Sequence, residues 1–302
     1  MQAKRYFFIF LFIAVTFCHI AGGDATQEIA LIKSTSIKPY DEAIRGFKSV
    51  CKANVREFTI SDLNGTELLK EVRKIRPVLI FAVGMDALSR MKRIKDIPII
   101  YAMVSNPMSM LSGEKNITGI GMNISAEKQL TALLEVSPDI KRIGLIYDPR
   151  KTAHLVDEAQ SAASSSGIEI VSRKVYSSKE VPSAIKDMKG KIDAFWMLPD
   201  ITVITQETIE YLLLFSFENS IPILTFSAKY VKIGALMALQ IDTMDVGQQA
   251  GEMANRIISG TNVGNIPMSL PRKAILSLNL ITAKRLGISV DDKIIRKSKI
   301  IY

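Results

Sequence analysis

Two polar residues, Ser105 and Asn106, directly follow a short apolar run, Ile99–Val104. Such a run is typical of a strand buried on both faces, and a central strand cannot continue through a following Pro107. Open α/β sheets bind ligands at the carboxyl ends of their strands. We therefore expect Ser105 and Asn106 to contact a small ligand, with Pro107 shaping the turn.

Gly84, Met85 and Asp86 follow another predicted strand, Val78–Val83, and precede a predicted helix. Free backbone N–H groups at the start of a helix bind anions such as carboxylates. The same position also suits Asp86 as a cap of that helix. From the sequence, both a ligand contact and a cap stay open.

The second half of the chain repeats this pattern at the ends of further predicted strands. A tyrosine there offers a ring for stacking and a hydroxyl for hydrogen bonding. Asp200 equally suits a helix cap and Asp242 a hinge hydrogen bond, while Trp196, inside a predicted strand, is assigned to the core. The candidate ligand-binding residues of this half are Tyr147, Asp148, Leu198, Asp200, Thr225, Phe226, Ser227 and Asp242.

The sequence gives little support for catalysis. Its two histidines are His19, in a predicted leader, and His154, predicted on a helix surface. It has no P-loop, no Gly-x-Ser-x-Gly or Gly-x-Gly-x-x-Gly motif, and no His/Cys cluster at metal-ligand spacing. An acid pair such as Asp148 and Asp200 would suit a hydrolase. We expect instead a protein that is not an enzyme and that uses no cofactor and no metal.

Residues 1–23 predict a cleaved signal peptide, and hence a periplasmic protein. Lys4 and Arg5 precede an apolar run, Tyr6–Ile20, which small residues follow. This run is too short to span a bilayer comfortably, and an uncleaved anchor is the alternative. The remaining chain keeps one cysteine, Cys51, expected to pack on the apolar face of a helix.

The composition is that of a globular protein, with 48% hydrophobic and 23% charged residues among 302. Without the leader, 37 basic and 30 acidic residues leave a net charge of +7. The basic residues are scattered and are not interleaved with aromatic ones. We therefore expect a solvated basic surface and no nucleic acid partner.

Short apolar runs alternate with helical patterns along residues 29–104 and again along residues 127–242. Such alternation favours parallel sheets covered by helices on both sides. The predicted fold class is therefore α/β with two doubly wound lobes. Between the two series the pattern predicts a strand at Ile117–Ile124, and within the second a helix at Thr152–Ser165.

The last amphipathic helix, Met244–Ser259, is expected to return to the first lobe, and residues 266–283 to cross again as extended chain. Three connections between lobes would make a three-segment hinge. The predicted domains are residues 24–123 with 243–272 for the N-terminal lobe, 124–242 for the C-terminal lobe, and 273–302 for a C-terminal crossing segment and tail.

Several segments, taken in order, resemble one family. The sequence is similar to the extracytoplasmic substrate-binding proteins of ABC transporters, in the group that includes tryptophan- and tyrosine-binding receptors, over residues 28–295. This resemblance implies a type I periplasmic-binding-protein fold, with two Rossmann-like lobes that close on a small solute and dock on an ABC permease in the inner membrane. The segments are DIPIIYAMVSNP, KNITGIGMNIS, KRIGLIYDP, LPDITVIT, IPILTFSAKYVKIGA, DVGQQAGEMANRIISGTNVGNIP and LNLITAKRLGISV.

The chain departs from the amino-acid-binding members of this family at three places. Asn106-Pro107 stands where Asp-Pro is common, Asp148-Pro149 where Asn-Pro is common, and Ser227-Ala228 where an acidic residue is common. An α-ammonium group needs carboxylate or carbonyl acceptors, which Asp148, Asp200 or Asp242 could supply. The resemblance implies an importer's solute-binding protein for a small polar or aromatic solute, with amino-acid-like solutes among the candidates. The alternative is a ligand-sensing subunit that reports to a membrane receptor or sensor kinase.

Overall fold

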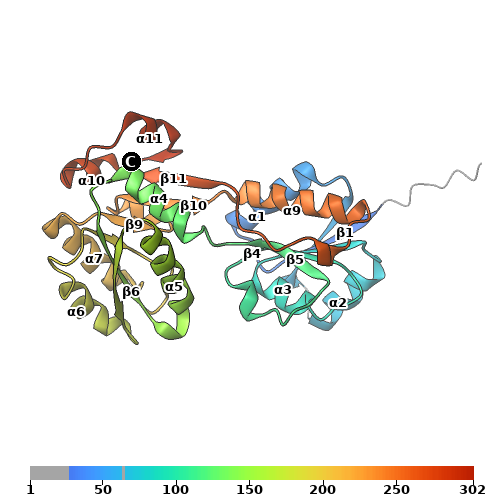
Figure 1. The fold of residues 1–302 in the computed structure, drawn as a ribbon. Helices are drawn as coiled ribbons and strands as arrows, with labels where there is room; N and C mark the ends of the chain where they lie inside the picture. Colours follow the sequence, from blue (N-terminus) through green and yellow to red (C-terminus); the bar gives the residue numbers. More distant parts are fainter. Residues whose placement is uncertain (1–26, 63–64) are drawn as a thin grey trace, which may run out of the picture.

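The computed structural model describes residues 27–62 and 65–302, so the predicted signal peptide lies outside the described residues. The described residues form two α/β lobes, between which the chain passes three times (Figure 1). None of the helices in these two ranges is long and apolar enough to cross a membrane.

The first lobe holds a parallel sheet of five strands in the order β2-β1-β3-β4-β5. Helices α1 and α9 cover one face of this sheet, and α2 and α3 the other (Figure 1). The strands are β1 (Glu28–Lys33), β2 (Asn54–Thr59), β3 (Leu79–Val83), β4 (Ile99–Val104) and β5 (Ile117–Gly121). The helices are α1 (Lys38–Val50), η1 (Ile60–Asp62), α2 (Gly65–Lys74), α3 (Met85–Met91), η2 (Pro107–Ser109), α9 (Thr243–Ile258) and η4 (Val263–Asn265).

Strand β1 shows why this lobe is covered on both sides. Successive side chains of a strand point to opposite faces. Ile29 and Leu31 pack in the core beneath α1 and α9, while Ala30 and Ile32 pack in the core beneath α2 and α3. An apolar residue at every position therefore requires helices on both faces, as the sequence predicted.

The second lobe holds a sheet of seven strands in the order β12-β11-β10-β9-β8-β6-β7. All neighbouring strands are parallel except β10 and β11, which are antiparallel. The strands are β6 (Arg142–Tyr147), β7 (Glu169–Lys174), β8 (Ala194–Trp196), β9 (Ile223–Thr225), β10 (Met237–Ile241), β11 (Ala274–Leu278) and β12 (Ile300–Ile301). The helices are α4 (Ala126–Val136), α5 (Pro149–Ser165), η3 (Ser178–Glu180), α6 (Val181–Lys186), α7 (Gln206–Asn219), α8 (Ala228–Lys232), α10 (Leu280–Arg285) and α11 (Asp292–Lys297).

The C-terminal segment, residues 273–302, contains β11, α10, α11 and β12, and its two strands extend the second sheet. Asn279 fastens it to that lobe, because its Nδ2 donates to the carbonyl of Val231 at 2.8 Å and its backbone N donates to Leu236 at 2.9 Å. The segment, expected as a crossing and tail, thus lies with the second lobe after a crossing by residues 267–273.

The three crossings lie side by side between the lobes (Figure 1). The first follows β5, which ends at Gly121 and not at Ile124, because Met122–Ser125 leads into α4. The second is Asp242, between β10 and α9. The third is held to the first sheet, since Ser269 exchanges backbone hydrogen bonds of 3.0 and 2.9 Å with Gly119 and Gly121.

Candidate functional site

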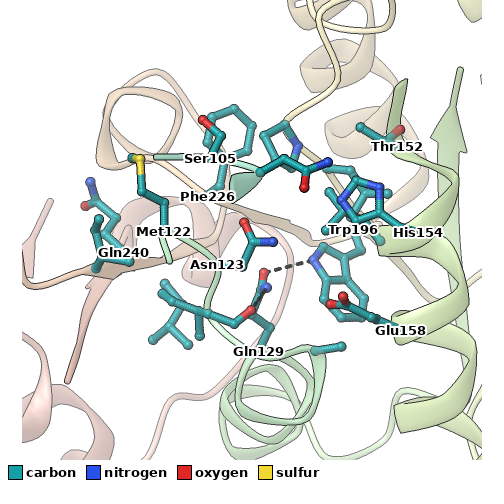
Figure 2. A pocket seen from close by; sticks show the side chains of 18 of the residues that line it. Ser105, Met122, Asn123, Gln129, Thr152, His154, Glu158, Trp196, Phe226 and Gln240 are labelled. Carbon is teal, nitrogen blue, oxygen red and sulfur yellow. Dashed lines mark hydrogen bonds between the residues drawn. The ribbon is translucent and has the colours of Figure 1, made fainter. Parts of the chain in front are cut away.

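A cavity of about 340 Å³ lies between the lobes, and we call it the cleft cavity (Figure 2). The first lobe contributes Ser105 and Asn106, which follow β4. The first crossing contributes Met122, Asn123 and Ile124, and the end of β10, next to the second crossing, contributes Gln240 and Ile241. The second lobe contributes Ala126, Gln129, Lys151, Thr152, His154, Leu155, Glu158, Trp196, Leu198, Pro199, Phe226 and Leu239.

The end of β4 is irregular where it delivers Ser105 and Asn106 to the cleft cavity. The backbone of Met103 has φ of +60°, a left-handed conformation that residues other than glycine rarely adopt. The pairing of β4 with β5 shifts register between Tyr101 and Val104. Bulges of this kind redirect side chains near functional sites. Asn106 then caps η2 by accepting a hydrogen bond from Ser109 N at 3.3 Å. The turn is therefore held by its own hydrogen bond.

Two aromatic side chains of the second lobe line the cleft cavity. Trp196 is only 2% exposed, and its Nε1 donates to Gln129 Oε1 at 3.1 Å (Figure 2). Phe226, which follows β9, contacts Tyr230 edge to face with ring centroids 5.4 Å apart. The sequence assigned Trp196 to the core, and it does pack there while also forming part of the cavity wall.

Asp148 caps α5 at the end of β6 and is fully buried. Its Oδ1 accepts hydrogen bonds from Arg150 N and Nε at 3.0 and 2.9 Å. Its Oδ2 accepts from Arg150 Nη2 at 2.7 Å and from Thr202 Oγ1 at 2.8 Å. Both carboxylate oxygens are therefore engaged with the loops around the cavity, and Asp148 does not line the cavity itself.

Asp200, 1% exposed, holds the loops after β6 and β8 together. Its Oδ2 accepts hydrogen bonds from Asp148 N at 2.8 Å and from the hydroxyl of Thr152. Its Oδ1 accepts from Thr202 N and Val203 N at 2.9 and 3.3 Å. Thr152 departs from helical geometry (φ −130°, ψ 19°), so α5 starts at Pro149 but becomes regular only after Thr152, where the sequence placed its start.

The network around Asp148 predicts an acid-sensitive fold. Hydrogen bonds from the Arg150 guanidinium, with others from Arg150 N and Thr202, hold the pKa of the Asp148 carboxyl well below its usual range. Because this pKa is lower in the folded than in the unfolded chain, ionised Asp148 stabilises the fold above about pH 4, and this contribution is lost as pH falls further. We expect the melting temperature of Arg150→Gln to fall less between about pH 5 and pH 3 than that of the wild type. An equal fall of melting temperature in the wild type and Arg150→Gln would contradict this role of the Arg150–Asp148 pair.

Of the other residues predicted to bind ligand, Leu198 and Phe226 line the cleft cavity together with Ser105 and Asn106. Tyr147 and Thr225 are buried within the second lobe. The capping residues of the set are Ser227, which accepts from Lys229 N at 3.3 Å and starts α8, and Asp242, which accepts from Asp245 N at 3.1 Å and starts α9. Their role as ligand contacts stays a prediction, as it does for Asp148 and Asp200.

Gly84, Met85 and Asp86 form the turn between β3 and α3, and none of them lines the cleft cavity. Gly84 has φ of +93°, and a Cβ there would lie 2.6 Å from both Ser34 Oγ and Tyr40 Oη. Only glycine fits this turn. Burial of the Tyr40 hydroxyl raises its pKa, and the negative charge of Asp86, which is exposed, raises this pKa further.

Sequence reasoning missed the face of α5 that enters the cleft cavity. Lys151, His154 and Glu158 are spaced three and four residues apart and so share one side of the helix. In the sequence this polar face is indistinguishable from a solvent-facing one. Asn123, Gln129 and Gln240 were also missed, because neutral amides carry no spacing signal. Within residues 27–62 and 65–302, no group of His, Cys, Asp and Glu side chains is arranged to hold a metal ion.

Comparison with known proteins identifies the family. A family profile described as ABC transporter substrate binding protein matches residues 52–300. A tyrosine-binding protein of Clostridioides difficile (strain R20291) is 31% identical over 217 residues, which are 69% of this chain and 62% of that protein. The match thus spans just under two thirds of that relative's length.

Solved structures share the fold. A ligand-free, open substrate binding protein with adhesive properties from Clostridium difficile has a TM-score of 0.78 at 22% identity, with 91% of this chain and 99% of that chain covered. An ABC domain in complex with L-Trp from Streptococcus pneumonia has a TM-score of 0.62 at 19% identity, covering 92% and 100%. The two lobes are therefore those of a type I periplasmic binding protein, as the resemblance implied. The chain belongs to the ABC transporter substrate binding protein family, whose members bind solutes and are not enzymes.

Proposed function

We propose that this protein is the periplasmic solute-binding protein of an ABC importer and that it binds a small polar or aromatic, amino-acid-like solute in the cleft cavity. The cavity itself carries the proposal, because it combines the aromatic walls of Trp196 and Phe226 with amide and hydroxyl groups from both lobes. Apolar walls with a few polar groups are typical of small-molecule sites. The similarity to a tyrosine-binding protein supports the same class of solute.

Four of the predicted residues are proposed as ligand contacts. Ser105 and Asn106 offer hydroxyl and amide groups from the first lobe, and Leu198 and Phe226 offer apolar surface from the second. A solute touching both pairs would stabilise the closed arrangement of the lobes more than the open one, and binding would shift the population toward closure.

The proposed hinge motion is confined by an ion cluster on the third crossing. The Arg272 guanidinium binds Asp245 at 3.0 Å and Glu252 at 2.9 Å, both on α9, and Lys273 binds Asp245 at 3.0 Å. Asp245 is 2% exposed, so the crossing is anchored to the first lobe up to Lys273. The rotation on this crossing is therefore expected at the junction of Lys273 with β11.

Tryptophan fluorescence tests the proposal directly, because Trp196 is the single tryptophan of the chain and lies in the cavity wall. We expect saturable changes in its emission on titration with one or more amino acids from a panel that also contains sugars and organic acids. Native mass spectrometry of freshly purified protein would show a co-purifying solute of the same class. A panel without any binding, together with protein free of small molecules, would overturn the proposal.

Phe226→Ala is expected to weaken the affinity for the solute by about tenfold or more, because an aromatic wall of the cavity is lost. Calorimetric titration would measure this change. Phe217→Ala is the matched control, because Phe217 does not line the cavity. Phe217 is on α7, and its ring packs against the guanidinium group of Arg285 on α10, with the guanidinium carbon 4.1 Å from the ring centroid. Equal losses in both variants would show a general effect on folding.

The proposed protein partner is an ABC permease in the inner membrane, on which the solute-binding protein docks. Deleting the gene is expected to abolish high-affinity uptake of the solute that the purified protein binds. Unchanged uptake, together with loss of a transcriptional response to that solute, would favour the sensing role.

A further inference from the structure

Glu158 supplies the acidic charge of the cleft. A second cavity of about 550 Å³ adjoins the cleft cavity on the side of the first lobe and shares Ser105, Asn106, Met122, Asn123, His154 and Glu158 with it. Among all the residues that line these two cavities, Glu158 is the acidic one, and Lys151 and His154 are the basic ones. Glu158 therefore lies where the two cavities meet, on the second-lobe side.

The other acids near the cleft are already occupied. Asp148 and Asp200 accept hydrogen bonds on both carboxylate oxygens from surrounding loops. Asp242 caps α9 and pairs with Lys299 at 3.3 Å. In the part of the chain that the structure describes, the Glu158 side chain makes no hydrogen bond or ion pair. Neither of the two basic lining residues pairs with it: His154 stands four residues before Glu158 in α5, and Lys151 seven residues before it.

Lobe closure would make this free carboxylate decisive. His154 and Glu158 project from α5 toward the cavity around Trp196, across from Asn123 (Figure 2). When the lobes approach, water leaves Glu158, and a buried carboxylate without a cationic partner opposes that approach. A cationic group on the solute removes this opposition.

We propose that Glu158 binds the cationic group of the solute and that it makes lobe closure selective for solutes that carry an ammonium group. The inference rests on the proposed function and adds the residue and the charge that select the solute. Ser227-Ala228, at the end of β9, carries no acid, so the acidic residue that lines the two cavities comes from α5.

The test uses three compounds that share one ring: tyramine, with an ammonium group alone, L-tyrosine, with ammonium and carboxylate, and 3-(4-hydroxyphenyl)propionate, with a carboxylate alone. Calorimetric titration compares wild type, Glu158→Gln, Glu158→Asp and Asp157→Asn. Asp157 is the matched control, because it is an exposed acid next along α5 that lines neither cavity.

We expect the wild type and Asp157→Asn to bind the two amines more tightly than the propionate. Glu158→Gln is expected to lose roughly 10- to 100-fold in affinity for both amines and to leave the propionate unchanged, as for a charged hydrogen bond. Glu158→Asp is expected to keep part of the preference. Unchanged amine binding by Glu158→Gln, or an equal loss for all three compounds, would overturn the role of Glu158.

The failure of the proposed function gives a different result. If the wild type binds only solutes without a cationic group from the wider panel, the role of Glu158 falls while the binding function stands. If it binds no solute at all, both fall.

Discussion

Asp200→Ala is expected to lower the free energy of unfolding of the second lobe by about 3 kcal/mol. Four donors, Asp148 N, the Thr152 hydroxyl, Thr202 N and Val203 N, lose their acceptor at a site that is 1% exposed. An unpaired buried donor costs its full desolvation energy, because water does not replace the lost partner. Urea denaturation followed by Trp196 fluorescence measures the effect, since Trp196 packs in the core of this lobe.

Asp193→Ala provides the comparison for that variant. Asp193 also accepts several hydrogen bonds, from Lys141 N, Arg142 N and the Arg142 guanidinium, but its side chain is 30% exposed. Water reaches the donors that it leaves behind, so a loss of about 1 kcal/mol is expected. Similar losses for Asp193→Ala and Asp200→Ala would mean that burial of the network does not set its contribution. Folded Asp200→Ala is also expected to bind solute more weakly, because Thr152 and Pro199 line the cleft cavity.

Gly247→Ala is expected to destabilise the first lobe by about 3 kcal/mol. A Cβ at Gly247 would lie 1.9 Å from the Ala43 carbonyl oxygen and 2.8 Å from Phe47 N, both backbone atoms of α1. At an unconstrained helical position the same change stabilises a protein by about 1 kcal/mol. A decrease in the free energy of unfolding, where an increase is usual, would therefore indicate the close contact between α1 and α9.

The two lobes report separately on Gly247→Ala. Circular dichroism in urea should show an earlier transition for the first lobe, while the transition of Trp196 fluorescence in the second lobe stays in place. Gly121→Ala is the control, because the atoms nearest its added Cβ are Leu270 Cδ2 at 3.7 Å and Ser269 O at 3.9 Å, which is ordinary contact. A neutral or stabilising Gly247→Ala would mean that α9 moves away from α1 at little cost.

The two-lobe α/β fold follows from local patterns in the sequence. The continuous apolar run of β1 is such a pattern, and it already required helices on both faces of the first sheet. The same logic placed Ser105, Asn106, Leu198 and Phe226 at strand ends, and these four residues line the cleft cavity.

The use of the other polar residues depends on contacts between segments that are distant in the sequence. Asp148 and Asp200 are 52 positions apart, and only the pairing of β6 with β8 brings the backbone N of Asp148 to the carboxylate of Asp200. The sequence therefore does not distinguish a strand-end aspartate that contacts a solute from one that accepts hydrogen bonds from another loop.

The face of α5 and the C-terminal segment show the same limit of local signals. The periodicity of α5 identifies a polar side, but only the first lobe placed across from it turns Glu158 from a surface residue into a cleft residue. Likewise the apolar run of β11 does not indicate which strand it pairs with. Only the structure shows that β11 lies antiparallel beside β10 in the second sheet.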